Sequence, residues 1–364
     1  MTRLIVSELR TVYDSLRKVQ EAEKKRVGEL ADLFSDNPRL IITPSNRCGN
    51  ACLHCVSDSR PDGVMMKYSD FANINPEFFT IFKVADFGRR GNPLLYESER
   101  QDLADLIKLL SSHGLEKFTI AAAIQPVYAP VIGKLGELAR KDNVHIDAMI
   151  TYHHYFANLD TKKLAEDFNQ SLKYLIKFSD KIIISMLGDN SSLRKPSMAE
   201  EVQRTFKDNL DLIMKDMAVV AHNNASYTID AEGKMVDIKI PTIDTRVYPL
   251  GRFRQYLSRK GILKKYELEF NNSLTDYVCP DLVRWPGIII EPDGGLNLCA
   301  SFEAIACSEA VVSNIFTKPY YEVKADLIDF QKKESCWLID NIGDVIKGKA
   351  STCKLKNHCY KARG

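Results

Sequence analysis

The stretch Leu40-Ile41-Ile42-Thr43-Pro44-Ser45-Asn46-Arg47-Cys48-Gly49-Asn50-Ala51-Cys52-Leu53-His54-Cys55 decides how the rest of the chain is interpreted. Its apolar beginning predicts a short strand, which leads directly into a loop that carries three thiols in the arrangement Cys-x3-Cys-x2-Cys. Three thiolates can bind three irons of a [4Fe–4S] cube, and the fourth iron is then open to a ligand that is not protein. Cys48, Cys52 and Cys55 are therefore the predicted ligands of an iron–sulfur cluster.

Two other uses of these cysteines fit the pattern less well. A zinc site more often uses paired Cys-x2-Cys knuckles, and this triplet has no second knuckle close by. A disulfide framework is not expected in a chain of 364 residues whose beginning, Met1–Glu8, turns polar too soon for a secretion signal. We expect a reducing, cytoplasmic environment.

A Cys-x3-Cys-x2-Cys loop directly after a first strand resembles the radical S-adenosylmethionine (SAM) superfamily. The resemblance implies that the open iron binds the amino and carboxylate groups of SAM, whose reductive cleavage gives methionine and a 5'-deoxyadenosyl radical. It also implies a reductant partner such as flavodoxin or ferredoxin. In that family an aromatic residue near the adenine usually precedes the third cysteine. Here His54 takes that place as a candidate SAM contact, or it packs within the loop.

The composition excludes several classes of partner. The chain has 50 basic and 48 acidic residues and a net charge of +2, so it offers no argument for binding nucleic acid or a membrane surface. No apolar run approaches the roughly 20 residues of a transmembrane helix. The hydrophobic content of 45% is ordinary for a globular protein.

The order of patterns along the chain predicts an α/β fold. Residues 4–34 look helical, ended by Asn37-Pro38, and form either a helix packed outside the main core or an arm that binds a partner. Strand and helix patterns then alternate. The expected strands are Leu40–Thr43, Ile81–Phe87, Lys117–Ala122, Val144–Thr151, Lys181–Leu187, Met217–Ala221 and Val236–Ile240, and the expected helices Glu97–Ser112, Val131–Lys141, Thr161–Phe178 and Ala199–Met214.

Such alternation favours a parallel sheet that curls into a barrel or part of one, with the site in loops after the carboxyl ends of the strands. The family resemblance implies a partial (βα)6-type barrel, so one of the seven expected strands is an insertion or wrongly assigned. We expect three regions: an N-terminal helical segment, the partial barrel and a C-terminal cluster-binding extension, over residues 1–38, 39–262 and 263–364.

The second expected strand ends in a turn that contains Gly91-Asn92-Pro93. Glycine permits close approach of the backbone and proline fixes the exit of the chain. The turn resembles the Gly-Gly-Glu-Pro segment that contacts the SAM amino group in radical SAM enzymes. Asn92 replaces the family's glutamate and Arg90 its first glycine, but backbone carbonyls can still accept hydrogen bonds from an ammonium group. Gly91, Asn92 and Pro93 are thus candidate cofactor-binding residues.

Three further segments carry candidates. Ser185 lies in a stretch similar to the family's fourth strand and is either a SAM contact or a buried hydroxyl. Arg246 and Arg252 flank Pro249-Leu250-Gly251, which looks like a barrel-closing Pro-x-Gly-Arg segment; either could clamp a carboxylate or form a structural ion pair. The His pair in Tyr152–Tyr155 could move protons or lie in a loop.

Six more cysteines occupy the C-terminal region, where Pro292-Asp293-Gly294 predicts a hairpin turn. The spacing looks like the auxiliary-cluster extensions called SPASM and twitch, with a reduced terminal motif. The resemblance implies one auxiliary [4Fe–4S] cluster, or two if the remaining thiols are recruited. Its expected ligands are Cys279, Cys299, Cys353 and Cys359. Cys307 and Cys336 are left as buried thiols, alternative ligands or, for Cys307 above all, a donor of a hydrogen atom.

These patterns favour an enzyme that cleaves SAM and abstracts hydrogen from a small polar substrate such as a sugar, aminosugar or nucleoside. The alternative is a maturase that crosslinks, epimerises or oxidises a ribosomally made peptide. A cluster-carrying scaffold or electron carrier would leave the three-ligand loop and the glycine turn without a role. The type of reaction and the substrate stay open.

Overall fold

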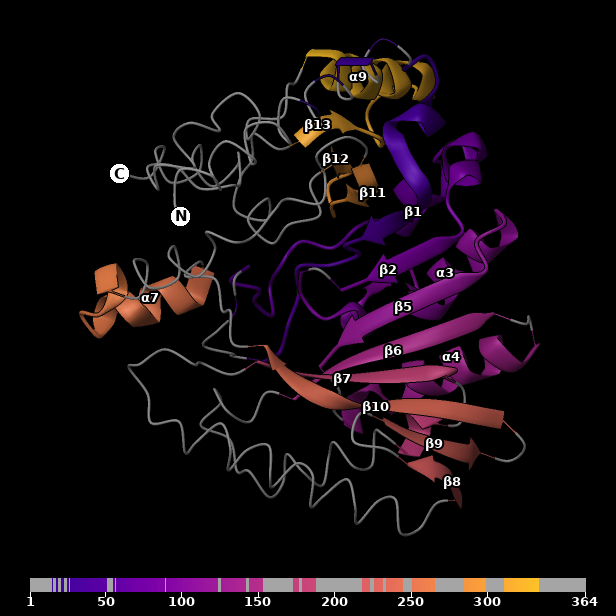
Figure 1. Ribbon diagram of the computed structural model, residues 1–364, viewed down its shortest axis with the longest axis vertical. Coiled ribbons are helices and arrows are strands. Elements are labelled where there is room, and N and C mark those ends of the chain that lie inside the picture. The colour runs from indigo at the N-terminus through magenta and orange to yellow at the C-terminus, as the bar shows by residue number, and fades with distance from the viewer. Residues whose placement is uncertain are drawn as a thin grey trace.

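The computed structural model describes residues 27–50, 57–88, 90–123, 126–141, 144–152, 179–187, 218–222, 226–231, 234–244, 251–265, 285–298 and 311–333, together with Cys55 and a few helical positions within 15–25 and 173–176 (Figure 1). Within these ranges no helix is both long and apolar enough to cross a membrane.

One large sheet organises the fold, and its centre consists of parallel strands that lie side by side in chain order (Figure 1). Each of these strands pairs in parallel register with the next. The carboxyl ends of all of them therefore meet at one edge, which is where an α/β sheet carries its site. The strands are β1 (Phe34–Ile42), β2 (Val84–Phe87), β5 (Lys117–Ala122), β6 (His145–Tyr152), β7 (Lys181–Leu187) and β10 (Lys234–Asp244).

Further strands extend this sheet on both sides. Beyond β10, β9 (Ser226–Ala231) and β8 (Ala218–His222) are added antiparallel. Beyond β1, β11 (Trp285–Ile290) runs parallel to it, and β12 (Gly295–Asn297) and β13 (Val311–Asn314) follow antiparallel. The C-terminal region thus contributes strands to the sheet that contains β1, the strand that leads into the loop of Cys48.

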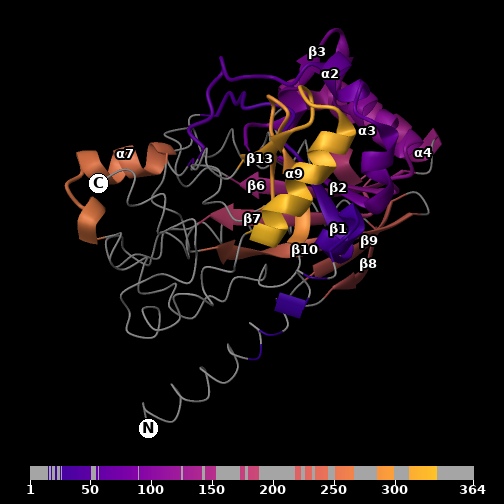
Figure 2. The ribbon, with the colours of Figure 1, turned by 90° about the horizontal axis from the view of Figure 1, so that it is seen from above.

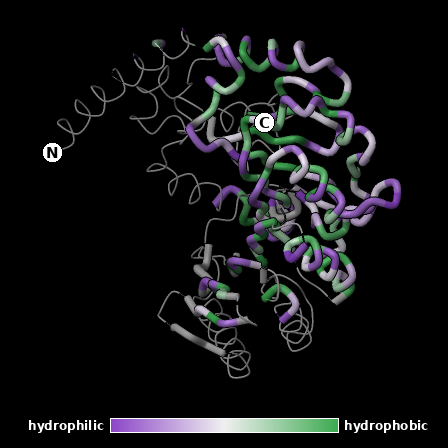
Figure 3. The backbone as a smooth tube through the Cα atoms, turned by 90° about the vertical axis from the view of Figure 1, so that its right-hand side faces the viewer, coloured by the Kyte–Doolittle hydropathy of each residue, from purple (hydrophilic) through white to green (hydrophobic). Residues whose placement is uncertain are grey.

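The two faces of the parallel strands differ. Residues at alternate positions, such as Phe118, Ile146 and Ile182, are fully buried on the face that α3 (Leu103–Ser112) and α4 (Ala129–Lys141) cover. These helices lie together on one side of the sheet (Figure 2). Figure 3 shows hydrophobic segments within this body and hydrophilic ones on its outer turns. Intervening positions, which include both polar residues such as Asp147 and apolar ones such as Met149, point to the other face.

Shorter elements complete the layer near β1. The helix α9 (Tyr320–Lys333) packs near β13 and η1 (Leu30–Leu33), and its Tyr320 ring meets Phe78 edge-on with centroids 6.5 Å apart. A small two-stranded sheet precedes α3. The remaining elements are α2 (Tyr68–Ala72), η2 (Pro76–Ile81), η3 (Pro93–Leu95), β3 (Glu97–Ser98), β4 (Gln101–Asp102), η4 (Pro126–Tyr128) and α7 (Gly251–Arg259).

Strand Lys117–Ala122 and strand Lys181–Leu187 are confirmed to the residue, and the mixed α/β class with a mostly parallel sheet is confirmed. Met217–Ala221 was expected to alternate with helices, but β8 belongs to an antiparallel extension, so it is an insertion beside the parallel series. The curvature of a partial barrel stays a prediction.

Several expected boundaries were wrong, and the strand expected from Ile81 begins only at Val84. The N-terminal helix does not reach residue 34, since η1 ends at Leu33 and β1 begins at Phe34. Asn37-Pro38 lies inside β1, where the pairing with β11 shifts register between Phe34 and Arg39, and such an irregularity tolerates proline. Helix Glu97–Ser112 starts only at Leu103, because the carboxylates of Asp102 and Asp105 form a capping box there.

The pairing of β11 with β1 predicts a stability difference between two glycines. A Cβ on Gly287 would lie 2.1 Å from the Arg39 carbonyl oxygen, whereas one on Gly133 in α4 would meet nothing within 4 Å. We expect Gly287→Ala to destabilise the fold by about 2 kcal/mol and Gly133→Ala to stabilise it by about 0.5–1 kcal/mol. Urea unfolding of both variants under anaerobic conditions measures this, and equal midpoints would contradict the pairing.

Candidate metal centre

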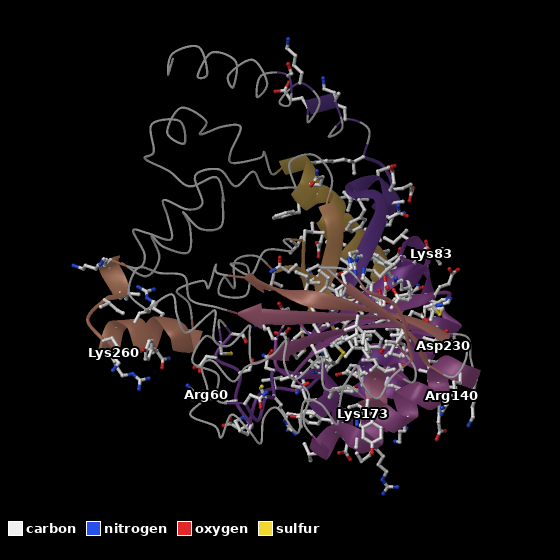
Figure 4. The ribbon with its side chains drawn as sticks, turned by 60° about the horizontal axis from the view of Figure 1, so that its bottom comes forward. Arg60, Lys83, Arg140, Lys173, Asp230 and Lys260 are labelled. Atoms are coloured by element: carbon white, nitrogen blue, oxygen red, sulfur yellow. The ribbon has the colours of Figure 1, made fainter. Side chains whose placement is uncertain are left out.

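The loop that leaves β1 is fixed by backbone hydrogen bonds to a returning segment. Asn46 N–H donates to the Val64 carbonyl at 2.8 Å, and Cys48 N–H donates to the Arg60 carbonyl at 3.0 Å. Arg60 lies toward the carboxyl ends of the strands, away from Lys83, which precedes β2 at the opposite end (Figure 4). The backbone of Cys48 is therefore held at the edge of the sheet where a site is expected.

The turn after β2 docks directly on this loop. Gly91 has φ of +66°, and a Cβ there would lie 2.3 Å from the Ser45 carbonyl oxygen and 2.6 Å from that of Arg47. Asn92 N–H donates to the Arg47 carbonyl at 2.7 Å. Only glycine allows this conformation together with this approach. The structure thus brings the predicted turn against the segment that enters the first cysteine.

A chain of hydrogen bonds connects the third cysteine to the same turn. The Cys55 sulfur accepts from Ser59 N–H at 3.4 Å and lies 3.5 Å from the Ser57 hydroxyl. The hydroxyls of Ser57 and Ser59 are 2.7 Å apart, and Ser59 Oγ accepts from Gly91 N–H at 2.9 Å. Hydrogen bonds to a sulfur tune the cluster that the sulfur binds.

Asn92 supports the turn from inside. It is 1% exposed, its Nδ2 donates to the Ala123 carbonyl at 2.8 Å, and its Oδ1 accepts from Leu94 N–H at 3.2 Å. The Asn92 side chain therefore ties the turn after β2 to the end of β5.

Tyr128 joins this group from η4 and was not expected from the sequence. It is 4% exposed, and burial raises the pKa of its hydroxyl. Negative charge on the nearby Cys48 sulfur raises that pKa further, and a hydrogen bond from Asn92 opposes the shift. Tyr128 thus places a neutral phenol close to both the first cysteine and the turn.

The turn also contacts the C-terminal hairpin. Arg90 Nη2 lies 3.5 Å from Glu291 Oε1, and the Glu291 side chain is 8% exposed. Glu291 begins the turn between β11 and β12, where its N–H donates to the Gly295 carbonyl at 2.9 Å. The predicted Pro-Asp-Gly hairpin is confirmed, and it lies beside β1. Arg90 thus bridges from the end of β2 to the end of β11.

The other predicted site residues are placed only in part. Ser185 lies in β7, where it pairs with Thr151 and Thr242, and Arg252 lies in α7. Nothing is described of their side chains. The positions outside the described residues are Cys52, His54, Arg246, Cys279, Cys299, Cys307, Cys336, Cys353 and Cys359. The His pair of Tyr152–Tyr155 also lies outside them.

The described donors fit an iron–sulfur cluster. Cys48 and Cys55 are half-buried cysteines at the carboxyl edge of the sheet. Asn46, two residues before Cys48, has a buried Oδ1 without a hydrogen-bond partner in the described part of the chain, so this oxygen is a candidate acceptor for a bound group. Among the described residues no group of three metal-binding side chains is found, and Cys52 is not among the residues searched.

Comparison with known proteins gives limited results. No protein-family model and no curated protein matches the sequence. The structure is similar to SuiB of Streptococcus suis bound to S-adenosylmethionine, with 12% identity and a TM-score of 0.41 over 85% of this chain and 68% of that one. It is also similar to SuiB bound to the precursor peptide SuiA, with 12% identity and a TM-score of 0.40 over 89% and 73%. We draw no functional conclusion from likenesses at this level.

The docking of the turn predicts different outcomes for two glycines near the cysteines. Gly91→Ala should destabilise the fold by about 2 kcal/mol and reduce iron bound on anaerobic reconstitution, because the Cβ meets backbone at positive φ. Gly49→Ala is the control, since a Cβ on Gly49 meets nothing within 4 Å. Iron analysis and thermal unfolding of both variants provide the measurement. Wild-type iron content in Gly91→Ala would show that the cluster does not need this contact.

Proposed function

We propose that the protein is a radical SAM enzyme, with Cys48, Cys52 and Cys55 as ligands of a site-differentiated [4Fe–4S] cluster. One observation carries the proposal: the loop of three thiols follows the first parallel strand, and the glycine turn of the second strand docks on it at Gly91. The cluster with SAM supplies, on reduction, a 5'-deoxyadenosyl radical that abstracts hydrogen from substrate. The partial (βα)6 barrel is part of this proposal.

The residues around the turn then have separate tasks. The carbonyls of Asn92 and Pro93 already accept from Leu95 N–H and Tyr96 N–H, each at 3.0 Å, within the turn of η3. The Gly91 carbonyl is therefore the proposed acceptor for the SAM ammonium group. Asn92 and Tyr128 position the turn, and the hydrogen bonds from Ser59 and Ser57 hold the sulfur of Cys55 in place.

The C-terminal hairpin supports the proposed auxiliary cluster. The strand β12 ends at Asn297, two residues before Cys299, and runs beside β11 at the edge of β1. We therefore expect at least one ligand of the auxiliary [4Fe–4S] cluster to lie near the cluster of the Cys48 loop. The proposed ligands of the auxiliary cluster are Cys279, Cys299, Cys353 and Cys359. A role of Cys307 as a hydrogen-atom donor, and roles of His54, Ser185, Arg246 and Arg252 at SAM, belong to the same proposal.

The substrate is a small polar molecule or, as second candidate, a peptide. SuiA, the ligand in one of the SuiB structures, belongs to the second class. Product analysis with a candidate peptide and with sugars or nucleosides distinguishes the two. Flavodoxin or ferredoxin is the proposed reductant.

Replacement of all three loop cysteines tests the assignment. The reduced wild type should convert SAM to 5'-deoxyadenosine and contain about eight irons per chain, four for each cube. Alanine at Cys48, Cys52 and Cys55 should abolish the cleavage and leave about four irons. Chromatography of 5'-deoxyadenosine and iron analysis measure both. Continued cleavage by the triple variant would refute the proposal, and a wild-type value near twelve irons would indicate a third cluster.

A further inference from the structure

A dense group of positive charges lies on α7 and on the turn that follows it. Residues 251–265 contain six arginines and lysines and no aspartate or glutamate, so the rest of the chain has 44 basic and 48 acidic residues. Four of the six are exposed in the structure, and we call them the basic turn: Arg259, Lys260, Lys264 and Lys265. This segment thus has a charge opposite to that of the remainder of the chain.

The backbone holds these four residues in one tight turn. Ile262 N–H donates to the Leu257 carbonyl at 3.1 Å, as in a Schellman motif. The second bond of that motif is also present, since Gly261 N–H donates to the Ser258 carbonyl at 2.9 Å. Gly261 supplies the left-handed conformation that the motif needs, with φ of +67°. The chain is helical again at residues 263–265, so two helix ends with positive charges meet at this glycine.

Helix stability accounts for only half of the basic turn. Arg259 and Lys260 lie at the C-terminal end of α7, where the helix dipole favours positive charge. Lys264 and Lys265 lie in the first helical turn after Gly261, where the dipole disfavours positive charge. Within the described part of the chain, no ion pair of these four side chains is found. An anionic partner would therefore offset a repulsion that the described residues leave in place.

The basic turn lies on the side of the sheet that carries the cysteine loop. The helix α7 follows β10, the last strand of the parallel series, so it starts beyond the carboxyl end of that strand. Figures 1 and 2 both show α7 on the same side of the sheet as the loop after β1. In Figure 4, Lys260 lies on the side of Arg60, and Arg140 lies on the opposite side. A molecule bound to the basic turn would therefore be on the side where Cys48 and Cys55 lie.

The other side of α7 argues for a partner that is a soluble protein. Leu257 is 1% exposed, so protein already covers the apolar side that a helix would insert into a membrane surface. What α7 and its turn present to solvent is positive charge, which attracts an acidic protein and raises the rate of encounter. Transient contacts between electron carriers and their partners use small interfaces, and one charged turn can supply much of such an interface.

We propose that the basic turn is the docking surface for an acidic protein that carries one electron. This rests on the proposed function, because the iron–sulfur cluster of the Cys48 loop must be reduced before SAM is cleaved. In the step that docking serves, one electron leaves the reduced carrier and enters that cluster, and no covalent bond forms or breaks. Nucleic acid would be attracted by the same charges but has no part in this reduction, so the place of the basic turn favours the carrier.

The test compares reconstituted wild type with a variant in which glutamine replaces all four cations of the basic turn. The formation of 5'-deoxyadenosine is measured against the concentration of reduced flavodoxin or ferredoxin, and separately with dithionite, a small reductant that needs no docking surface. The variant should need about tenfold more carrier, or more, for its half-maximal rate, and its rate with dithionite should equal that of the wild type. Added salt should raise the carrier concentration that the wild type needs and change that of the variant little.

The end of α4 provides a matched control. Arg140 and Lys141 end α4 as Arg259 and Lys260 end α7, but Arg140 lies on the opposite side of the sheet (Figure 4). Glutamine at Arg140 and Lys141 should leave the use of carrier unchanged, whereas glutamine at Arg259 and Lys260 should weaken it. Thermal unfolding checks that all variants fold.

Three results have different meanings. Equal use of carrier by the fourfold variant and the wild type, or no cleavage with either carrier in a wild type that is active with dithionite, would overturn the inference. Binding of a short single-stranded DNA that the fourfold variant loses, with its use of carrier unchanged, would overturn it in favour of nucleic acid. Absence of SAM cleavage by the wild type with dithionite would instead refute the proposed function.

Discussion

The arrangement of the site depends on the close approach of Gly91 to the carbonyls of Ser45 and Arg47. The loops after β1 and β2 leave adjacent parallel strands, which lie about 4.8 Å apart, so their backbones must pass one another at the same edge. A residue with a Cβ at this position would push the turn away from the cysteine loop. The amide of Asn92 and the hydroxyl of Ser59 then fix the approach that the glycine allows.

The sequence predicted correctly those strands whose own residues form a distinctive pattern. Lys117–Ala122 and Lys181–Leu187 alternate or run apolar between clear breaks, and both were placed correctly. The strand β9 was missed although a two-residue gap that includes Gly233 separates it from β10, which is a typical hairpin spacing. The early start of β1 could not be predicted, because it depends on pairing with β11, some 250 residues later in the chain.

The site shows the same division between features that a local sequence pattern reveals and features that only the fold brings together. Cys48 and the glycine turn could be recognised because each is a local motif. Tyr128 could not, since its significance comes from its position in the fold beside Cys48 and Asn92. Ser59 is an intermediate case. Its position four residues after Cys55 is visible in the sequence, but its hydrogen bond with Gly91 N–H exists only in the fold.

The ion pair of Arg90 and Glu291 connects the turn after β2 to the C-terminal hairpin. The Arg90 side chain reaches a carboxylate that is almost buried. Burying such a pair costs desolvation energy that the attraction only partly offsets, so stability alone is a weak reason for it. Its geometric effect is definite, because it connects the turn at the cysteine loop to the hairpin that leads toward Cys299. The pairing of β11 with β1 places the hairpin beside the first strand, and the ion pair adds a side-chain connection between the two regions that carry the cysteines.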